Sequence, residues 1–185
     1  MRARPHMIVA TVLAVAALSL TNAGVSDAHP PTVTILRGDG LATLRLGARQ
    51  PSAITALDRL FGRPTTRITA TPDLRNCGVN AQGTWRSMSA YFFHGRLVGL
   101  SFGPGRTPSV RTDVGLRLGE TLARARTLYG TRLTTSGNNG GSWFVSTPVG
   151  RIDGFLNPSG ASALRPAATI LTMDVGSVGC PAMSP

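Results

Sequence analysis

The sequence has no lysine, although arginine is frequent. Its 19 basic side chains stand against eight acidic ones, which gives a net charge of +11 over 185 residues. Nucleic-acid-binding proteins usually gather their cations in one run or on one stripe, whereas these arginines fall singly along the chain. Arginine can be encoded by GC-rich codons and lysine cannot, so we attribute the positive charge mostly to GC-rich coding bias. It favours solubility and weak attraction to anionic surfaces, and we expect no specific nucleic-acid partner.

Histidine and nucleophile motifs are also scarce, which argues against several enzyme classes. A serine or cysteine nucleophile needs a base, usually histidine, and after His29, at the start of the expected mature chain, only His94 is available, at a predicted hairpin tip. No G-x-S-x-G motif occurs. The glycine-rich stretches 38–40 and 137–141 lack the strand–glycine–helix context and the lysine of a phosphate-binding loop. The sequence therefore predicts no catalytic residue, no cofactor and no metal site.

Carboxylates are few, and their positions indicate turns. Asp39 and Asp113 each precede one copy of a repeated motif described below, which favours a structural role in equivalent turns. A catalytic pair would have to form from acids distant in sequence, with Asp153 and Asp174 as the members that a cleft could bring beside another carboxylate. A cell-envelope enzyme of this kind is the alternative hypothesis for function.

One long hydrophobic run occurs, at the amino terminus. Arg2 and Arg4 precede an uncharged stretch of 14 residues from Met7 to Leu20, and small residues follow up to Ala28. This order of basic head, apolar run and small residues is that of a secretory signal peptide, and the run is short of the roughly 20 apolar residues of a membrane span. We expect a signal peptide over residues 1–28, with cleavage after Ala28 or, as second choice, Ala23. The remaining chain, 29–185, should be one globular domain, secreted or in the cell envelope, with no further membrane contact.

Cysteine occurs twice, as Cys77 and Cys180. In a chain exported to an oxidising compartment, one intramolecular disulfide between them is the expected state. Two free buried thiols are the alternative.

Internal repetition is the most informative pattern. The motif Leu-Arg-Leu-Gly occurs at 44–47 and again at 116–119, and each copy precedes a short helix pattern that ends in Gly62 or Gly130. A third match pairs 95–100 with 150–155, in the same order. Repeats of this kind indicate units that bury their apolar faces together. We predict two tandem modules, at about 40–105 and 110–181.

Within each module the residues predict one helix and a set of antiparallel strands. Ile54, Leu57 and Phe61 form one apolar stripe, as do Leu122, Ala125 and Tyr129. Hairpins are predicted over 87–102 and 142–157, and a last strand over 168–175. The predicted fold class is α+β: tandem helix-plus-β-meander modules that form one antiparallel sheet with short helices on one face.

These motifs resemble secreted actinobacterial two-module proteins over about residues 40–180. The module resembles that of β-lactamase inhibitory protein and, more distantly, that of the SmpA/OmlA-type outer-membrane assembly lipoproteins. In the inhibitor each module carries its own disulfide, whereas this chain has one cysteine per copy, which suggests a bridge between the copies. No inhibitory loop matches residue by residue, so the resemblance implies a fold and assigns no site.

The adjacent aromatic residues Trp143 and Phe144 supply the one site prediction. Successive strand residues point to opposite faces, so one of the two must point away from the core. An exposed aromatic on a sheet is a plausible contact for a protein partner. The sequence therefore predicts a secreted protein-binding or structural module, whose partner is an extracellular or envelope protein and whose candidate contacts are Trp143 and Phe144.

Overall fold

The computed structural model describes residues 33–70, 78–105, 109–158 and 160–178. The predicted signal peptide and both cysteines, Cys77 and Cys180, lie outside these residues. Among the described residues, no helix has both the length and the apolar character needed to cross a membrane.

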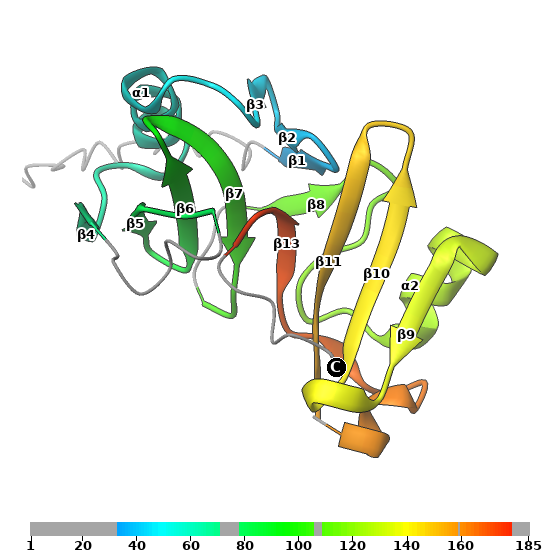
Figure 1. Ribbon diagram of the computed structural model, residues 1–185. Coiled ribbons are helices and arrows are strands. Elements are labelled where there is room, and N and C mark those ends of the chain that lie inside the picture. The colour runs from blue at the N-terminus through cyan, green and yellow to red at the C-terminus, as the bar shows by residue number, and fades with distance from the viewer. Residues whose placement is uncertain (1–32, 71–77, 106–108, 159, 179–185) are drawn as a thin grey trace, which may run out of the picture.

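A long antiparallel sheet runs from one end of the molecule to the other (Figure 1). Its strand order is β4-β5-β6-β7-β13-β11-β10-β9, with β12 paired to β11 beside this path. The strands are β4 (Thr66–Ala70), β5 (Ala81–Trp85), β6 (Met88–Phe93), β7 (Arg96–Phe102), β9 (Leu133–Ser136), β10 (Ser142–Thr147), β11 (Gly150–Asn157), β12 (Thr169–Ile170) and β13 (Met173–Gly176).

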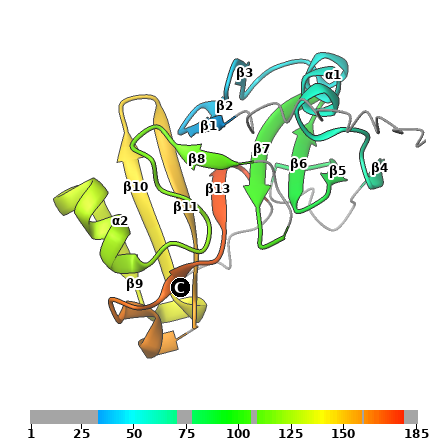
Figure 2. The same cartoon turned by 180° about the vertical axis from the view of Figure 1, so that it is seen from behind.

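Two α-helices pack against the same face of this sheet, because their buried residues join one core with Leu100, Val175 and Ile152, which lie in one row on that face. Figure 2 shows the helices towards opposite ends of the sheet. In α1 (Gln50–Phe61), Pro51 lies in the first turn, where its missing N–H costs nothing. The buried residues of α1 are Ala53, Leu57 and Phe61, so the stripe is rotated slightly from the predicted one and Ile54 is only partly buried. The ring of Phe61 packs against that of Phe102 on β7, with centroids 6.3 Å apart.

The second helix, α2 (Leu122–Tyr129), follows the prediction closely. Its buried residues are Leu122, Ala125 and Tyr129. The Thr121 hydroxyl caps the helix by accepting a hydrogen bond from the Arg124 backbone N–H. A 3-10 turn, η2 (Gly130–Arg132), leads on to β9, and two more, η3 (Asn138–Gly140) and η4 (Gly160–Leu164), lie at the far end of the second half.

Each helix is followed by its own set of antiparallel strands, and the two sets meet where β7 pairs with β13. The buried side chains Leu100 and Phe102 of β7 lie opposite Val175 and Met173 of β13, so the core is continuous across this join. The predicted α+β fold class is confirmed. Both predicted hairpins also form, and in the β6–β7 turn His94 and Gly95 both have positive φ.

The strand order places the third sequence match in different parts of the two strand sets. Residues 95–100 lie at β7, the last strand of the first set, whereas residues 150–155 lie in β11, which is followed by β12 and β13 in the second set. The third sequence match therefore joins strands at different positions of the two meanders. Strands of alternating small and apolar residues resemble one another wherever they stand in a sheet.

A second, smaller sheet was not predicted. It has the order β3-β2-β1-β8, with β1 (Thr34–Arg37), β2 (Gly40–Leu41), β3 (Leu44–Arg45) and β8 (Val110–Thr112). The β1–β8 pair is parallel. The first Leu-Arg-Leu-Gly motif begins in β3, whereas the second forms only an isolated bridge between Arg117 and Arg111.

Candidate binding face

The face of the long sheet opposite the helices is named the open face. Strand alternation builds it, because the apolar residues of each strand point toward the helices and the residues between them point the other way. In β10, for example, Trp143 and Val145 are buried while Phe144 is half-buried. The open-face residues of the central strands are Thr84, Ser89, Tyr91, Ser101, Asp174, Arg151, Asp153, Phe155 and Phe144.

The two predicted contact residues separate as alternation requires. Trp143 is 1% exposed and belongs to the core, which corrects its role as a candidate contact. Phe144 lies on the open face, and the guanidinium carbon of Arg151 stands 4.0 Å above its ring centroid. Phe144 therefore stays a candidate contact, already stacked with a cation.

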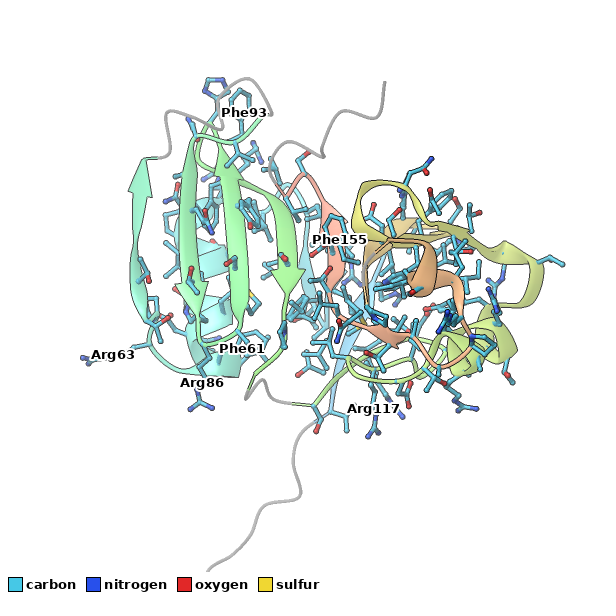
Figure 3. The ribbon with its side chains drawn as sticks, turned by 90° about the horizontal axis from the view of Figure 1, so that it is seen from below. Phe61, Arg63, Arg86, Phe93, Arg117 and Phe155 are labelled. Carbon is cyan, nitrogen blue, oxygen red and sulfur yellow. The ribbon has the colours of Figure 1, made fainter. Side chains whose placement is uncertain are left out.

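Another aromatic residue on the open face was not among the predicted contacts. Phe155 is 43% exposed, and Figure 3 shows it beside β13 near the middle of the molecule, while Arg63 and Arg86 lie at one end. Tyr91 on β6 is half-buried. The signal for Phe155 was available in the sequence, because it follows Asp153 by two positions in a strand whose intervening residues are apolar or glycine.

The centre of the open face is a cross-strand pair of acids. Asp153 on β11 lies directly opposite Asp174 on β13, and Asp174 in turn lies opposite Ser101 on β7. Asp174 is 4% exposed. Its Oδ2 accepts a hydrogen bond of 3.2 Å from the Thr172 hydroxyl, while its buried Oδ1 has no partner among the described atoms.

Burial controls the titration of this pair. The pKa of Asp174 is raised to about 6, mainly by desolvation and also by the charge of Asp153, while the hydroxyls of Ser101 and Thr172 act in the opposite direction. Burial also raises the pKa of Asp153, against the lowering effect of Arg151. The Nε of Arg151 lies 2.8 Å from Asp153 Oδ2. Desolvation, and then the charge of Asp174, raises the pKa of Tyr91.

Asp39, Asp113 and the internal histidine have local roles. Asp39 forms a salt bridge of 3.1 Å with Arg45 beside the β1–β2 turn. Asp113 Oδ1 accepts a hydrogen bond from the Val114 backbone N–H in the turn after β8. His94 lies at the hairpin tip, with its ring 4.0 Å from that of Phe93. These positions agree with the turn roles expected from the sequence, and neither Asp39 nor Asp113 lies in the strands that carry the acid pair.

A hollow of about 440 Å³ lies apart from the acid pair. Its walls come from the segment before β8, the second Leu-Arg-Leu-Gly motif and the β11–β12 region, with Arg117, Val110 and Ile170 among them. Neither Asp153 nor Asp174 lines it. The acids thus belong to an open sheet surface and not to this hollow.

Comparison with known proteins gives little to set beside this geometry. No protein-family model matches the sequence, and no curated protein matches it. Among solved structures, the chain is similar to the crystal structure of the uncharacterized protein YfeY from Escherichia coli. The sequence identity is 10% and the TM-score 0.45, over 80% of this chain and 99% of that one.

Proposed function

We propose that the protein is a secreted protein-binding module and that the open face is the surface on which it binds an extracellular or envelope protein. The observation that carries this proposal is the one-sided sheet: both helices pack on one face, and the other presents aromatic and charged side chains to solvent.

The composition of the open face favours a protein partner. Interfaces are enriched in aromatic residues and arginine, and a few such residues supply most of the binding free energy. The open face carries Phe144 stacked with Arg151 and the exposed ring of Phe155. Rigid rings of this kind bury large apolar area at low cost in side-chain entropy.

Capture from the protein's own culture medium tests the proposal. We expect the mature chain to retain a specific protein, and Phe155→Ala and Phe144→Ala each to reduce the amount retained by tenfold or more, the effect of removing an interface hot spot. Leu164→Ala is the matched control, because Leu164 is an exposed apolar residue of η4, 38% exposed and outside the strands of the open face. Equal retention by all three variants would contradict the assignment of the face.

The acid pair favours a second candidate function, a cell-envelope hydrolase. A carboxyl group with raised pKa beside a second carboxylate is the arrangement that general acid–base hydrolysis uses, and Asp174 beside Asp153 has this form. Release of soluble fragments from purified bacterial cell wall tests it. A hydrolase should release fragments with the native chain and lose at least a hundredfold in rate with Asp174→Asn; no release by the native chain argues for the binding function alone.

A further inference from the structure

We infer that Asp153 and Asp174 together receive a lysine or arginine side chain of the protein partner, and that a proton on Asp174 competes with this cation. The inference rests on the proposed binding function of the open face and names the chemistry that the face recognises. It requires a receiving oxygen, a net negative charge, an apolar surround and a means of access.

The receiving oxygen is Asp174 Oδ1. It is buried and forms no hydrogen bond of good geometry with the described atoms, although Thr172 holds the other oxygen of the same carboxylate and the Ser101 hydroxyl opposite it lowers its pKa. Thr172 is itself held in place, because its Oγ1 accepts a hydrogen bond of 2.9 Å from the Phe155 backbone N–H. An ionised carboxylate oxygen left without a partner in a desolvated site is costly. A cationic donor from outside the chain would remove this cost.

Arg151 does not fill this role. Its Nε is bound to Asp153 Oδ2 at 2.8 Å, and its guanidinium is stacked on the ring of Phe144. Stacking on the β10 side of β11 places the guanidinium away from β13, which pairs with the other edge of β11. Arg151 therefore binds Asp153 and leaves Asp174 for another cation.

Charge and access both favour a cationic side chain. At the centre of the open face β11 and β13 supply two acids and one arginine, a local excess of negative charge in a chain of net charge +11. The side chain of Asp153 is 33% exposed and can be reached from solvent, and the nearly buried Asp174 is its cross-strand neighbour. No third acid, histidine or cysteine joins them to make a metal-binding group in the described part of the chain, and two carboxylates are fewer protein ligands than bound metal ions usually take.

The surround suits the stem of a long basic side chain. Lysine and arginine bury their aliphatic stems along apolar surface while the charged head binds a polar group. Phe144 and Phe155 stand on the same face as the acids. Phe144 lies directly opposite Asp153 on the neighbouring strand, and Phe155 follows Asp153 by two positions on the same strand. Aromatic rings in these positions also attract the cation itself.

A proton competes for the same site in the mildly acidic range. The groups that face Asp174 are Thr172 on its own chain segment, Asp153 and Arg151 on β11, Ser101 on β7 and Tyr91 on β6. Burial, Ser101, Asp153 and Thr172 together set its pKa at about 6. At about pH 7.5 the carboxylate is almost fully ionised and at about pH 5 only about a tenth of it is, so cation binding should weaken about tenfold between these values.

An NMR titration of the mature chain tests the inference without a known partner. The probes are N-acetyl-arginine amide and its uncharged analogue N-acetyl-citrulline amide. We expect the arginine probe, at millimolar concentrations, to shift the carboxyl carbons of Asp153 and Asp174 and the amides of Thr172 and Ser101. The effect should be about tenfold weaker at about pH 5 than at about pH 7.5, and the citrulline probe should leave these signals unchanged.

Two variants complete the test. Asp174→Asn should abolish the shifts, while Asp113→Asn, which neutralises an exposed acid in the turn after β8, should leave them intact. Equal shifts with both probes, or shifts that survive Asp174→Asn, would overturn the cation site. Loss of the cation site is distinct from failure of the binding function. The binding function is measured by how much of the partner from the culture medium the Phe155→Ala and Phe144→Ala variants retain. A partner retained normally by Asp174→Asn would overturn the cation site and leave the binding function standing.

Discussion

The indole nitrogen of Trp85 donates a hydrogen bond of 2.7 Å to Asp58 Oδ1, which ties β5 to α1. The other tryptophan, Trp143, is equally buried on β10, but its indole nitrogen has no partner among the described atoms. The two tryptophans thus lie in the same core, and only one of them contributes a side-chain hydrogen bond.

This difference predicts unequal costs for one substitution at two sites. Trp85→Phe should lower the free energy of unfolding by about 1.5–3 kcal/mol more than Trp143→Phe, the typical contribution of a hydrogen bond to a charged group. Chemical denaturation of the two variants measures the difference. Asp58→Asn keeps an acceptor oxygen and should cost less than Asp58→Ala. Equal losses for the two tryptophans would show that packing alone decides their contribution.

Asp174 should make stability depend on pH. Its pKa is raised from 3.8 to about 6 in the folded chain, so the folded state binds the proton more tightly than the unfolded state does. The stabilising effect of this proton is complete below about pH 3.8 and is lost as pH rises through about 6. Above pH 6, Asp174→Asn should therefore be more stable than the native chain, by on the order of 3 kcal/mol at most. Thermal melts between about pH 4 and pH 8 provide the measurement, with Asp113→Asn as control; a parallel pH profile for Asp174→Asn and the native chain would refute the assignment.

Gly154 marks a close approach of β11 to the chain before β13. A Cβ at this position would stand 2.7 Å from the carbonyl carbon of Thr172 and would collide with its carbonyl oxygen. The contact is with backbone, which cannot rotate away, so Gly154→Ala should lower the free energy of unfolding by about 1–3 kcal/mol. Gly103→Ala is the control, because the nearest atom to its Cβ would be Ser87 O at 3.8 Å. Denaturant midpoints of the two variants should differ clearly, and the inference fails where they coincide.

The predicted Cys77–Cys180 bond would close a loop of about 100 residues, which in the chain-entropy model is worth roughly 4–5 kcal/mol. We expect Cys77→Ser and Cys180→Ser each to lower the melting temperature substantially. The double variant should be no worse than either, because each single change already destroys the same bond. Thiol titration of unreduced protein measures the bond directly, and two reactive thiols would count against it.

Local patterns in the sequence were sufficient for the helices, the hairpins and the orientation of single strand residues. The apolar stripes predict the buried sides of α1 and α2, His94-Gly95 forms a tight turn, and alternation along β10 separates Phe144 from Trp143. Each of these features depends on residues a few positions apart, where backbone geometry and side-chain periodicity act directly. Such interactions act between residues close in the sequence, so they can be predicted without knowing the rest of the fold.

Tertiary structure alone decided which strands became neighbours. The parallel β1–β8 pair, the β7–β13 join and the register that sets Asp153 opposite Asp174 and Asp174 opposite Ser101 all connect segments far apart in the chain. A strand pattern specifies its own faces but not its partner, because any strand of the same period offers the same hydrogen bonds and a shift of register by two residues keeps every face. The acid pair therefore emerged only when the core residues Leu100, Val175 and Ile152 packed against one another and brought the residues between them into one row.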